Sequence, residues 1–246
     1  DLADLPADES DLDPVPPPRG PVVPDGEHPA WLKYRDGGPF FLCGSGDPED
    51  FLYRGDLNPD GTRSGGGQEA MIEKMAGSGA NAIYMQAVRS HGVDGDATHN
   101  PFVDNDPGQG LNEAVLDQWE GWFQTMDESG IVIFFFFYDD STRIWDTGDS
   151  VGDAERSFVQ ALVDRFEHHD HLIWAVAEEY QERYSAQRVS ALAALIKDAD
   201  DAGHAVAVHK LHGLDFSEFA DDPHLDQFAI QYNVETAEEL HGGMLE

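Results

Sequence analysis

The chain has 246 residues, of which 49 are acidic and 14 basic, so its formal net charge is −35 at pH 7. This charge argues against nucleic acid and anionic membrane surfaces as partners, because both would repel the protein. Aliphatic and aromatic residues recur along the chain, so we expect a folded protein rather than a disordered one. Acid spread over the whole chain predicts a halophilic protein, since in molar salt the Debye length is only about 3 Å and self-repulsion is screened.

Cysteine usage and hydropathy restrict the class further. Cys43 is the only cysteine, which excludes an internal disulfide and a cysteine-based metal site. It stands in an apolar segment, and we expect a small buried residue rather than a nucleophile. No stretch has the ~18 apolar residues that span a bilayer. The sequence begins at Asp1, without an initiator Met or signal peptide, so we expect a processed or trimmed product.

Residues 1–26 form the first recognisable segment. They contain Asp, Glu and Pro but no aromatic residue, and residues 14–18 read PVPPP. Such a run predicts extended polyproline, which makes a semi-rigid acidic linker. Linkers of this kind commonly separate a module from an anchor or another domain. We therefore expect an extracellular or cell-surface setting.

From Trp31 onward, short apolar runs alternate with longer amphipathic ones. The short runs predict strands over residues 40–44, 80–86, 131–138, 172–177, 204–208 and 228–232. The longer runs predict helices over residues 68–78, 112–129, 153–167 and 186–202, with a further helix starting near Thr236. Strands that alternate with helices indicate a parallel sheet covered on both faces.

Two α/β architectures fit this order, the open doubly wound sheet and the closed (β/α)8 TIM-type barrel. Neither a G-x-G-x-x-G turn nor a G-x-x-x-x-G-K-[ST] loop is present, which argues against a nucleotide-binding sheet. Polar or aromatic residues follow nearly every predicted strand, as they do where a barrel has its active site at the carboxyl ends of the strands. These residues are Asp47, Arg89, His91, Asp139, Asp140, Glu178, Glu179, His209, His212, Tyr232 and Asn233.

We therefore predict an α/β fold of the (β/α)8 type, with only about six βα units in this chain. Residues 27–246 would supply strands one to six. An open six-stranded barrel would leave two unpaired edges. For that reason we expect the chain to be part of a longer polypeptide.

The fourth predicted strand ends in two consecutive glutamates, Glu178 and Glu179. If the chain stays extended there, their side chains point to opposite sides of the sheet. Glycoside hydrolysis needs two carboxyl groups, one of them protonated near neutral pH. Desolvation at the lip of an apolar barrel would raise the pKa of a glutamate in the required direction.

The spacing from Trp174 to Glu179 resembles the W-x-x-x-N-E ending of strand four in the large clan of retaining (β/α)8 glycosidases that includes the cellulase-like enzymes. Residues 39–44, 90–96 and 228–233 resemble uncharacterised cellulase-like glycosidases of this clan. The resemblance covers about residues 27–246. The spacing from Trp174 to Glu179 and these three segments together carry the resemblance.

This resemblance implies roles for individual residues. Glu179 falls on the acid/base position, and Glu178 replaces the usual Asn, which hydrogen-bonds the sugar 2-hydroxyl. Arg89 falls near the arginine that orients the nucleophile, and Tyr232 matches an aromatic residue that touches it. The nucleophile, a Glu ending strand seven, would lie beyond Glu246.

Further residues are candidates for contacts with the sugar. Trp145 could stack on the apolar face of a pyranose, although a core tryptophan fits its surroundings as well. Residues 134–137, four phenylalanines, are too apolar for a site and indicate barrel interior and helix packing. The candidate substrate-binding residues are Glu178, Arg89, His91, Asp47, Tyr138, Asp139, Asp140, Trp145, His209 and Tyr232.

Two segments have the composition of metal sites. His168, His169 and His171 cluster before strand four, at the stability end of a barrel, and we interpret them as structural histidines. The loop Asp94–Asn100 offers hard oxygen ligands but fails the EF-hand pattern, because His99 stands where Gly is needed. We expect the acidic side chains of this loop to be exposed to solvent. The sequence therefore predicts no metal and no cofactor.

We expect a halophilic, retaining glycoside hydrolase that acts on an extracellular glycan or oligosaccharide. A non-catalytic glycan-binding or surface-display module with the same barrel, within a larger assembly, is the first alternative. A metal-dependent hydrolase that uses the histidines after strand five with Asp139 or Asp140 is the second. The expected partners are a carbohydrate and other domains or subunits of a surface assembly, not nucleic acid and not a membrane.

Overall fold

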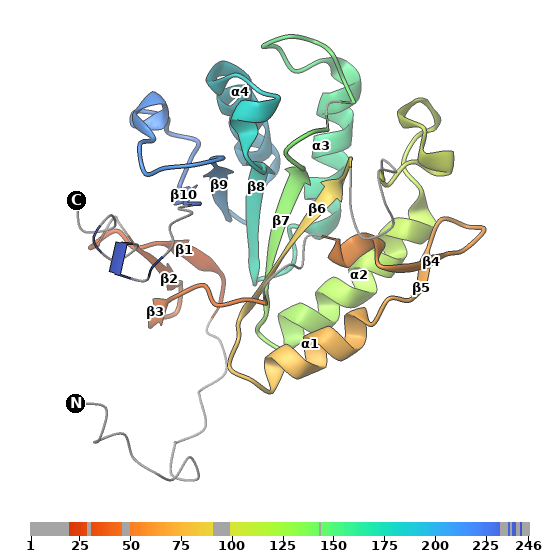
Figure 1. The fold of residues 1–246 in the computed structure, drawn as a ribbon, viewed down its shortest axis with the longest axis horizontal. Coiled ribbons are helices and arrows are strands. Elements are labelled where there is room, and N and C mark those ends of the chain that lie inside the picture. The colour runs from red at the N-terminus through yellow and green to blue at the C-terminus, as the bar shows by residue number, and fades with distance from the viewer. Residues whose placement is uncertain are drawn as a thin grey trace.

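The computed structural model describes residues 20–28, 31–45, 50–90, 99–142 and 144–231, together with residues 236, 238, 239 and 242. Its centre is a sheet of five parallel strands in the order β10-β9-β8-β7-β6 (Figure 1). The strands are β6 (Ala82–Val88), β7 (Val132–Tyr138), β8 (Leu172–Ala177), β9 (Ala205–His209) and β10 (Gln227–Ala229). Beyond β6, Gly44 forms a single parallel bridge with Ala82. The sheet is thus a parallel α/β sheet, as predicted.

Helices connect the strands and pack on one face of this sheet (Figure 1). They are α1 (Gln68–Ala76), α2 (Glu113–Glu128), α3 (Asp153–Phe166) and α4 (Ala186–Ala199). Short 3-10 helices are η3 (Phe51–Tyr53), η4 (Val103–Asn105), η5 (Pro107–Gln109), η6 (Tyr180–Glu182) and η7 (Ser217–Phe219). Side-chain caps begin two of the long helices, because Asn112 accepts a bond from the Ala114 N–H and Ser185 accepts one from the Arg188 N–H. None of the helices in the described ranges is long and apolar enough to cross a bilayer.

Strand β7 shows how the apolar sequence is divided between the two faces. Phe135 and Phe137 pack with Trp119 and Phe166 in the core between sheet and helices. Phe134 and Phe136 instead join the smaller cluster on the inner face. This alternation follows from the period of two along a strand. A strand that is buried on both faces therefore appears in the sequence as one continuous apolar run.

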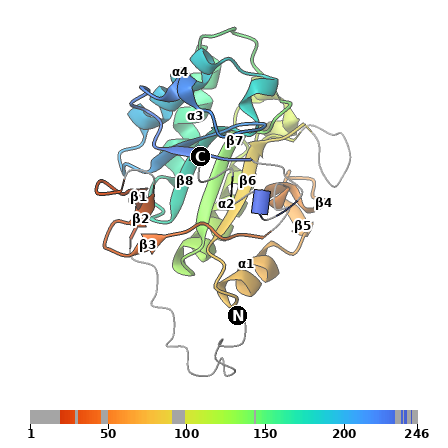
Figure 2. The same cartoon turned by 60° about the vertical axis from the view of Figure 1, so that its left-hand side comes forward.

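A three-stranded antiparallel sheet lies against the amino-terminal end of the inner face (Figure 2). It contains β1 (Val22–Pro24), β2 (Leu32–Tyr34) and β3 (Pro39–Phe40). The Asn81 side chain, just before β6, donates to the Phe41 carbonyl and accepts from the Cys43 N–H, both at 2.8 Å. A separate hairpin pairs β4 (Gly55–Leu57) with β5 (Arg63–Gly65).

The beginning of the chain differs from expectation. Residues 22–24 were expected in the linker 1–26, yet they form β1 and pair with β2. Residues 40–44 were expected as the first barrel strand, but β3 ends at Phe40 and pairs antiparallel with β2. The chain leaves this small sheet at Phe41, which is 75% exposed. Cys43 is exposed as well, so the expectation of a buried cysteine is wrong.

Helix α4 ends three residues before the predicted end at 202. Asp200 is the cause, because its side chain accepts the N–H groups of Ala202 and His204 and so holds a turn in place of the helix. Gly203 supplies the left-handed backbone of that turn, at φ 77°. At the far end, Thr236 and Glu239 form a reciprocal capping box, in keeping with the helix expected near Thr236.

Candidate active site

A cavity of about 570 Å³ lies on the inner face of the sheet, toward the carboxyl ends of the strands. Its apolar wall is Leu42, Tyr84, Phe134, Phe136, Phe228, Ala229 and Ile230, and its polar wall is Asp140, Glu178, Glu179, His209, Gln227 and Gln231. An apolar wall that faces a few convergent polar groups is the usual composition of a small-molecule site. Of the predicted site residues, the structure brings Asp140, Glu178, Glu179 and His209 together here.

Glu178 continues the ladder between β7 and β8, since its N–H donates to the Tyr138 carbonyl at 3.0 Å. Its side chain accepts a hydrogen bond at Oε2 from the Nε2 of Gln86. Gln86 is fully buried on β6. Its side-chain amide extends past the intervening strand β7 to reach Glu178. An amide N–H can only donate, so this oxygen of Glu178 accepts the bond.

Glu179 has a left-handed backbone, with φ 39° and ψ 48°. This conformation is uncommon for residues other than glycine and carries strain. Two contacts hold it: the Glu179 N–H donates to Nδ1 of His209 at 2.9 Å, and the Glu179 carbonyl accepts the Glu182 N–H at 3.0 Å. Because the extended chain ends here, Glu178 and Glu179 line the same cavity. Opposite orientations were expected only for a chain that stays extended.

His209 ends strand β9 and packs edge-on against Phe136, with ring centroids 6.0 Å apart. Burial lowers the pKa of His209 to about 4, because desolvation disfavours the imidazolium. The ring is thus neutral at neutral pH. Nδ1 accepts the Glu179 N–H and is unprotonated, so the ring proton is on Nε2. His209 therefore supports the backbone of Glu179 as a neutral acceptor.

The two aspartates after β7 have different surroundings. Asp139 is fully buried, and its Oδ2 accepts the N–H and hydroxyl of Ser90 at 2.5 and 2.7 Å. Its Oδ1 accepts the Thr142 N–H at 2.7 Å. Asp139 therefore joins the loops after β6 and β7. Asp140 lines the cavity instead.

Three carboxylates gather beside the cavity. Oxygens of Asp140, Glu179 and Glu182 lie within 4.8 Å of one another. Such a group could hold a hard cation, and a proton or a cation would offset the repulsion within it. Carboxylates come together readily in so acidic a chain, and we assign no cation to them. His209 contacts the Glu179 N–H and Asp139 contacts Ser90. The alternative of a metal-dependent hydrolase that uses the histidines after strand five with Asp139 or Asp140 stays a prediction.

The structure places three of the predicted site residues away from the cavity wall. Tyr138 lies on the helix-facing side, where its hydroxyl donates to Oε1 of Glu155 at 2.8 Å, and burial raises its pKa well above the usual value. Trp145 packs on Phe158, with ring centroids 5.2 Å apart. Arg89 is 2% exposed. None of the three is among the described residues that line the cavity.

Trp145 thus packs as a core tryptophan, one of the two interpretations left open for it. Tyr138 differs from expectation because Glu155, at the start of α3, gives its hydroxyl a partner on the helix side. Asp47, His91 and Tyr232 lie outside the described residues, as does most of the loop Asp94–Asn100. Their predicted roles stay predictions.

Sequence reasoning missed the apolar wall and Gln86. Phe134 and Phe136 were assigned to packing alone, yet both line the cavity. The signal was the alternation of residues along β6 and β7, which places Tyr84, Gln86, Phe134 and Phe136 on one face. A glutamine inside an apolar strand also needs a polar partner, and that requirement points to a site.

A parallel sheet with outer helices and a cavity at the carboxyl ends of its strands define part of a (β/α)8-type barrel, and paired carboxylates follow β8. Solved structures share this fold. A glycoside hydrolase family 5 protein from Bacteroides vulgatus has a TM-score of 0.62 at 19% identity, over 85% of this chain and 44% of that one. A family 5 mannosidase from Rhizomucor miehei has a TM-score of 0.63 at 17% identity, over 86% of this chain and 61% of that one.

The chain belongs to the family of Apiosidase-like catalytic domains, whose model matches residues 27–241. A comparison with curated proteins finds no match. The chain spans less than two thirds of the length of the two structures described above.

Proposed function

We propose that this chain carries the acid/base half of a retaining glycoside hydrolase site, with Glu179 as the general acid and base. One observation supports this most strongly: both glutamates that end β8 line one cavity whose opposite wall is aromatic and apolar. Aromatic faces pack well on the apolar face of a sugar ring, while carboxylates and amides bind its hydroxyl groups. Family membership favours the same chemistry.

In the proposed mechanism, Glu179 gives its proton to the glycosidic oxygen as the bond to the anomeric carbon breaks. A second carboxylate attacks that carbon and forms a glycosyl-enzyme. Glu179 then takes a proton from water, which hydrolyses the intermediate. Retention needs the second carboxyl group about 5–5.5 Å from the first. We propose a glutamate after the seventh barrel strand, beyond Glu246, for this part.

Glu178 is proposed as a substrate-binding residue. Where the clan pattern has Asn, a carboxylate can only accept hydrogen bonds from the sugar. The bond from Gln86 fits this role, since it orients Glu178 by donating to Oε2. Glu178 would then bind a sugar hydroxyl next to the bond that Glu179 cleaves.

The proposed setting is extracellular or at the cell surface, in high salt, with other domains or subunits beside this chain. A net charge of −35 and the acidic, proline-rich start of the chain support it. The substrate is proposed to be a glycan or oligosaccharide. Because the family is named for an apiosidase, apiosides are the first substrates to test.

The test uses the full-length protein in molar salt and a panel of glycosides. Glu179→Gln should lower kcat by about 10²–10⁴-fold, because the proton donor is lost. Glu128→Gln makes the same chemical change at an exposed position on α2, and should keep full activity. Undiminished turnover by Glu179→Gln would refute the assignment. Sugar binding without turnover in the unaltered protein would instead favour a glycan-binding module.

A further inference from the structure

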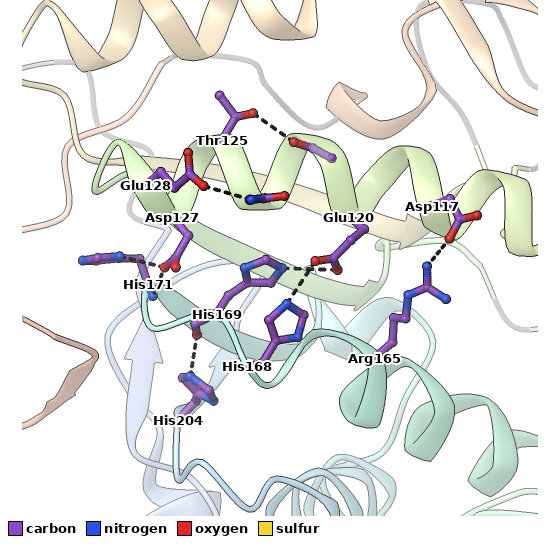
Figure 3. Close-up of polar contacts among 12 residues, drawn as sticks. Asp117, Glu120, Thr125, Asp127, Glu128, Arg165, His168, His169, His171 and His204 are labelled. Atoms are coloured by element: carbon purple, nitrogen blue, oxygen red, sulfur yellow. Dashed lines mark hydrogen bonds and ion pairs between the residues drawn. The ribbon is translucent and has the colours of Figure 1, made fainter.

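Three side chains that can bind metals converge at the amino-terminal end of β8, away from the proposed active site (Figure 3). Glu120 comes from α2, and His168 and His169 come from the turn between α3 and β8. The Nε2 of His168 lies 3.0 Å from Oε1 of Glu120, and the Nε2 of His169 lies 3.4 Å from Oε2 of the same carboxylate. One ligand atom from each residue lies within 4.8 Å of the other two.

We propose that Glu120, His168 and His169 form a structural binding site for a zinc-like divalent cation. Zinc binds imidazole nitrogens at about 2.0–2.1 Å and carboxylate oxygens at about 2.0–2.2 Å, so neighbouring ligands on a tetrahedral ion are about 3.4 Å apart. The two imidazoles contact different oxygens of the Glu120 carboxylate, at 3.0 and 3.4 Å, and one ligand atom from each of the three residues lies within 4.8 Å of the others, so a modest inward movement of the ligands would close them around an ion.

The environment suits a cation with one open side. The His169 side chain is 4% exposed, whereas His168 is 57% exposed, so the buried ligand is held in place and the exposed one gives a path from solvent. Water can complete the coordination on the exposed side. The Glu120 carboxylate supplies a negative charge next to both rings.

Each ring would bind through its Nε2, the atom that contacts Glu120, and would carry its proton on Nδ1.

The two neighbouring histidines, His171 and His204, contact other carboxylates, so we assign them no role as metal ligands. His171 contacts Asp127 Oδ1 through Nδ1 at 2.8 Å, and its backbone N–H donates to the same oxygen at 2.7 Å. His204 contacts Oδ1 of Asp200 at 3.0 Å and reaches the His169 carbonyl through Nε2 at 2.9 Å. His204 therefore fixes the backbone that carries a ligand (Figure 3).

The ligand types favour zinc over calcium or magnesium, because those ions prefer oxygen ligands throughout. A bound ion would tie α2 to the start of β8. The six residues of β8 are about 20 Å long, so the ion would act on stability and not on the reaction. In the sequence, the spacing of His168, His169 and His171 resembles a metal cluster, and their position before strand four favoured structural roles. Glu120, the third ligand, lies 48 positions before His168.

The test compares thermal unfolding of the EDTA-treated full-length protein with and without added ZnCl2. At a zinc concentration a hundredfold above Kd, Tm should rise by about 5–10 °C. His168→Ala and Glu120→Gln should each lower zinc affinity at least tenfold. Cobalt should give the visible absorption of a four-coordinate site in the unaltered protein but not in these two variants.

His224→Ala is the matched control, because His224 is 40% exposed and pairs with a single carboxylate, Asp222, at 3.0 Å. It should keep the full zinc response. The response is the difference in Tm with and without zinc for each variant, so a loss of stability from the substitution itself cancels. An equal response in His168→Ala and the unaltered protein, or no zinc response, overturns the proposal.

Discussion

The two ends of strand β8 carry polar clusters of opposite character. At the amino-terminal end, His171 with Asp127 and His204 with Asp200 are compact pairs, with nitrogen–oxygen distances of 2.8 and 3.0 Å. At the carboxyl-terminal end, Glu179 sits in a strained backbone and faces a cavity. Strain and a cavity cost stability, and proteins keep them where function needs them. The comparison separates residues that hold the fold from residues placed to act on a ligand.

The largest expected effect on stability at the cavity end concerns His209. Its pKa is about 4 in the folded chain and about 6.5 when unfolded, so the unfolded chain binds more protons between these values. The associated stability is present above pH 6.5 and is lost as the pH falls toward 4, by about 3 kcal/mol in total. His209→Gln, which keeps an acceptor for the Glu179 N–H, should remove this part of the pH dependence.

The measurement is the free energy of unfolding by urea, at pH values from 4 to 7, for the unaltered protein and the variant. His28→Gln is the control, since His28 is 68% exposed and pairs with Asp25 at the surface. Its curve should follow that of the unaltered protein. The same slope in His209→Gln would contradict the neutral, buried state of His209.

Gln86→Leu should affect activity more than stability. The substitution removes the donor to Glu178 and leaves an apolar side chain of similar size on the inner face. A hydrogen bond to a charged group contributes about 1.5–3 kcal/mol, so kcat/KM should fall about 10–100-fold. Kinetics and Tm are measured together. A normal kcat/KM with a large loss of Tm would mean that Gln86 supports the fold alone.

Asp127→Asn should show the reverse pattern, with a smaller effect. Desolvation alone would raise the pKa of Asp127, but its hydrogen bonds from His171 lower it below the usual value. The stability from this pairing is present above pH 4 and is lost as the carboxylate is protonated at lower pH. At pH 7 the variant should lose about 1 kcal/mol in urea unfolding and keep its kcat/KM. Reduced activity at unchanged stability would break the proposed division between the two ends.

The local sequence pattern was enough to predict the strand β8 and the helices α1, α2 and α3. The boundaries of β8 were predicted to the residue, and α1, α2 and α3 to within two residues, because their apolar periods and caps are local. The position of Glu178 and Glu179 after β8 followed from the same reasoning.

The rest depended on contacts between distant residues. A left-handed backbone is usually indicated in a sequence by glycine or asparagine, and Glu179 is neither. Its conformation is held by His209 from the next strand. Gln86 and Glu178 meet across 92 positions, and Glu120 lies 48 positions before His168. Phe40, which was expected in the first barrel strand, lies in β3 because it pairs with Leu32 of β2.

The central claim is that Glu179 protonates the leaving group, and rates on glycosides with different leaving groups test it most directly. For Glu179→Gln, the account predicts a large loss with a poor leaving group and a much smaller loss in the first step with a good one, such as a nitrophenolate, which departs without a proton. An equal loss for both leaving groups, in a variant that remains folded, would contradict the account.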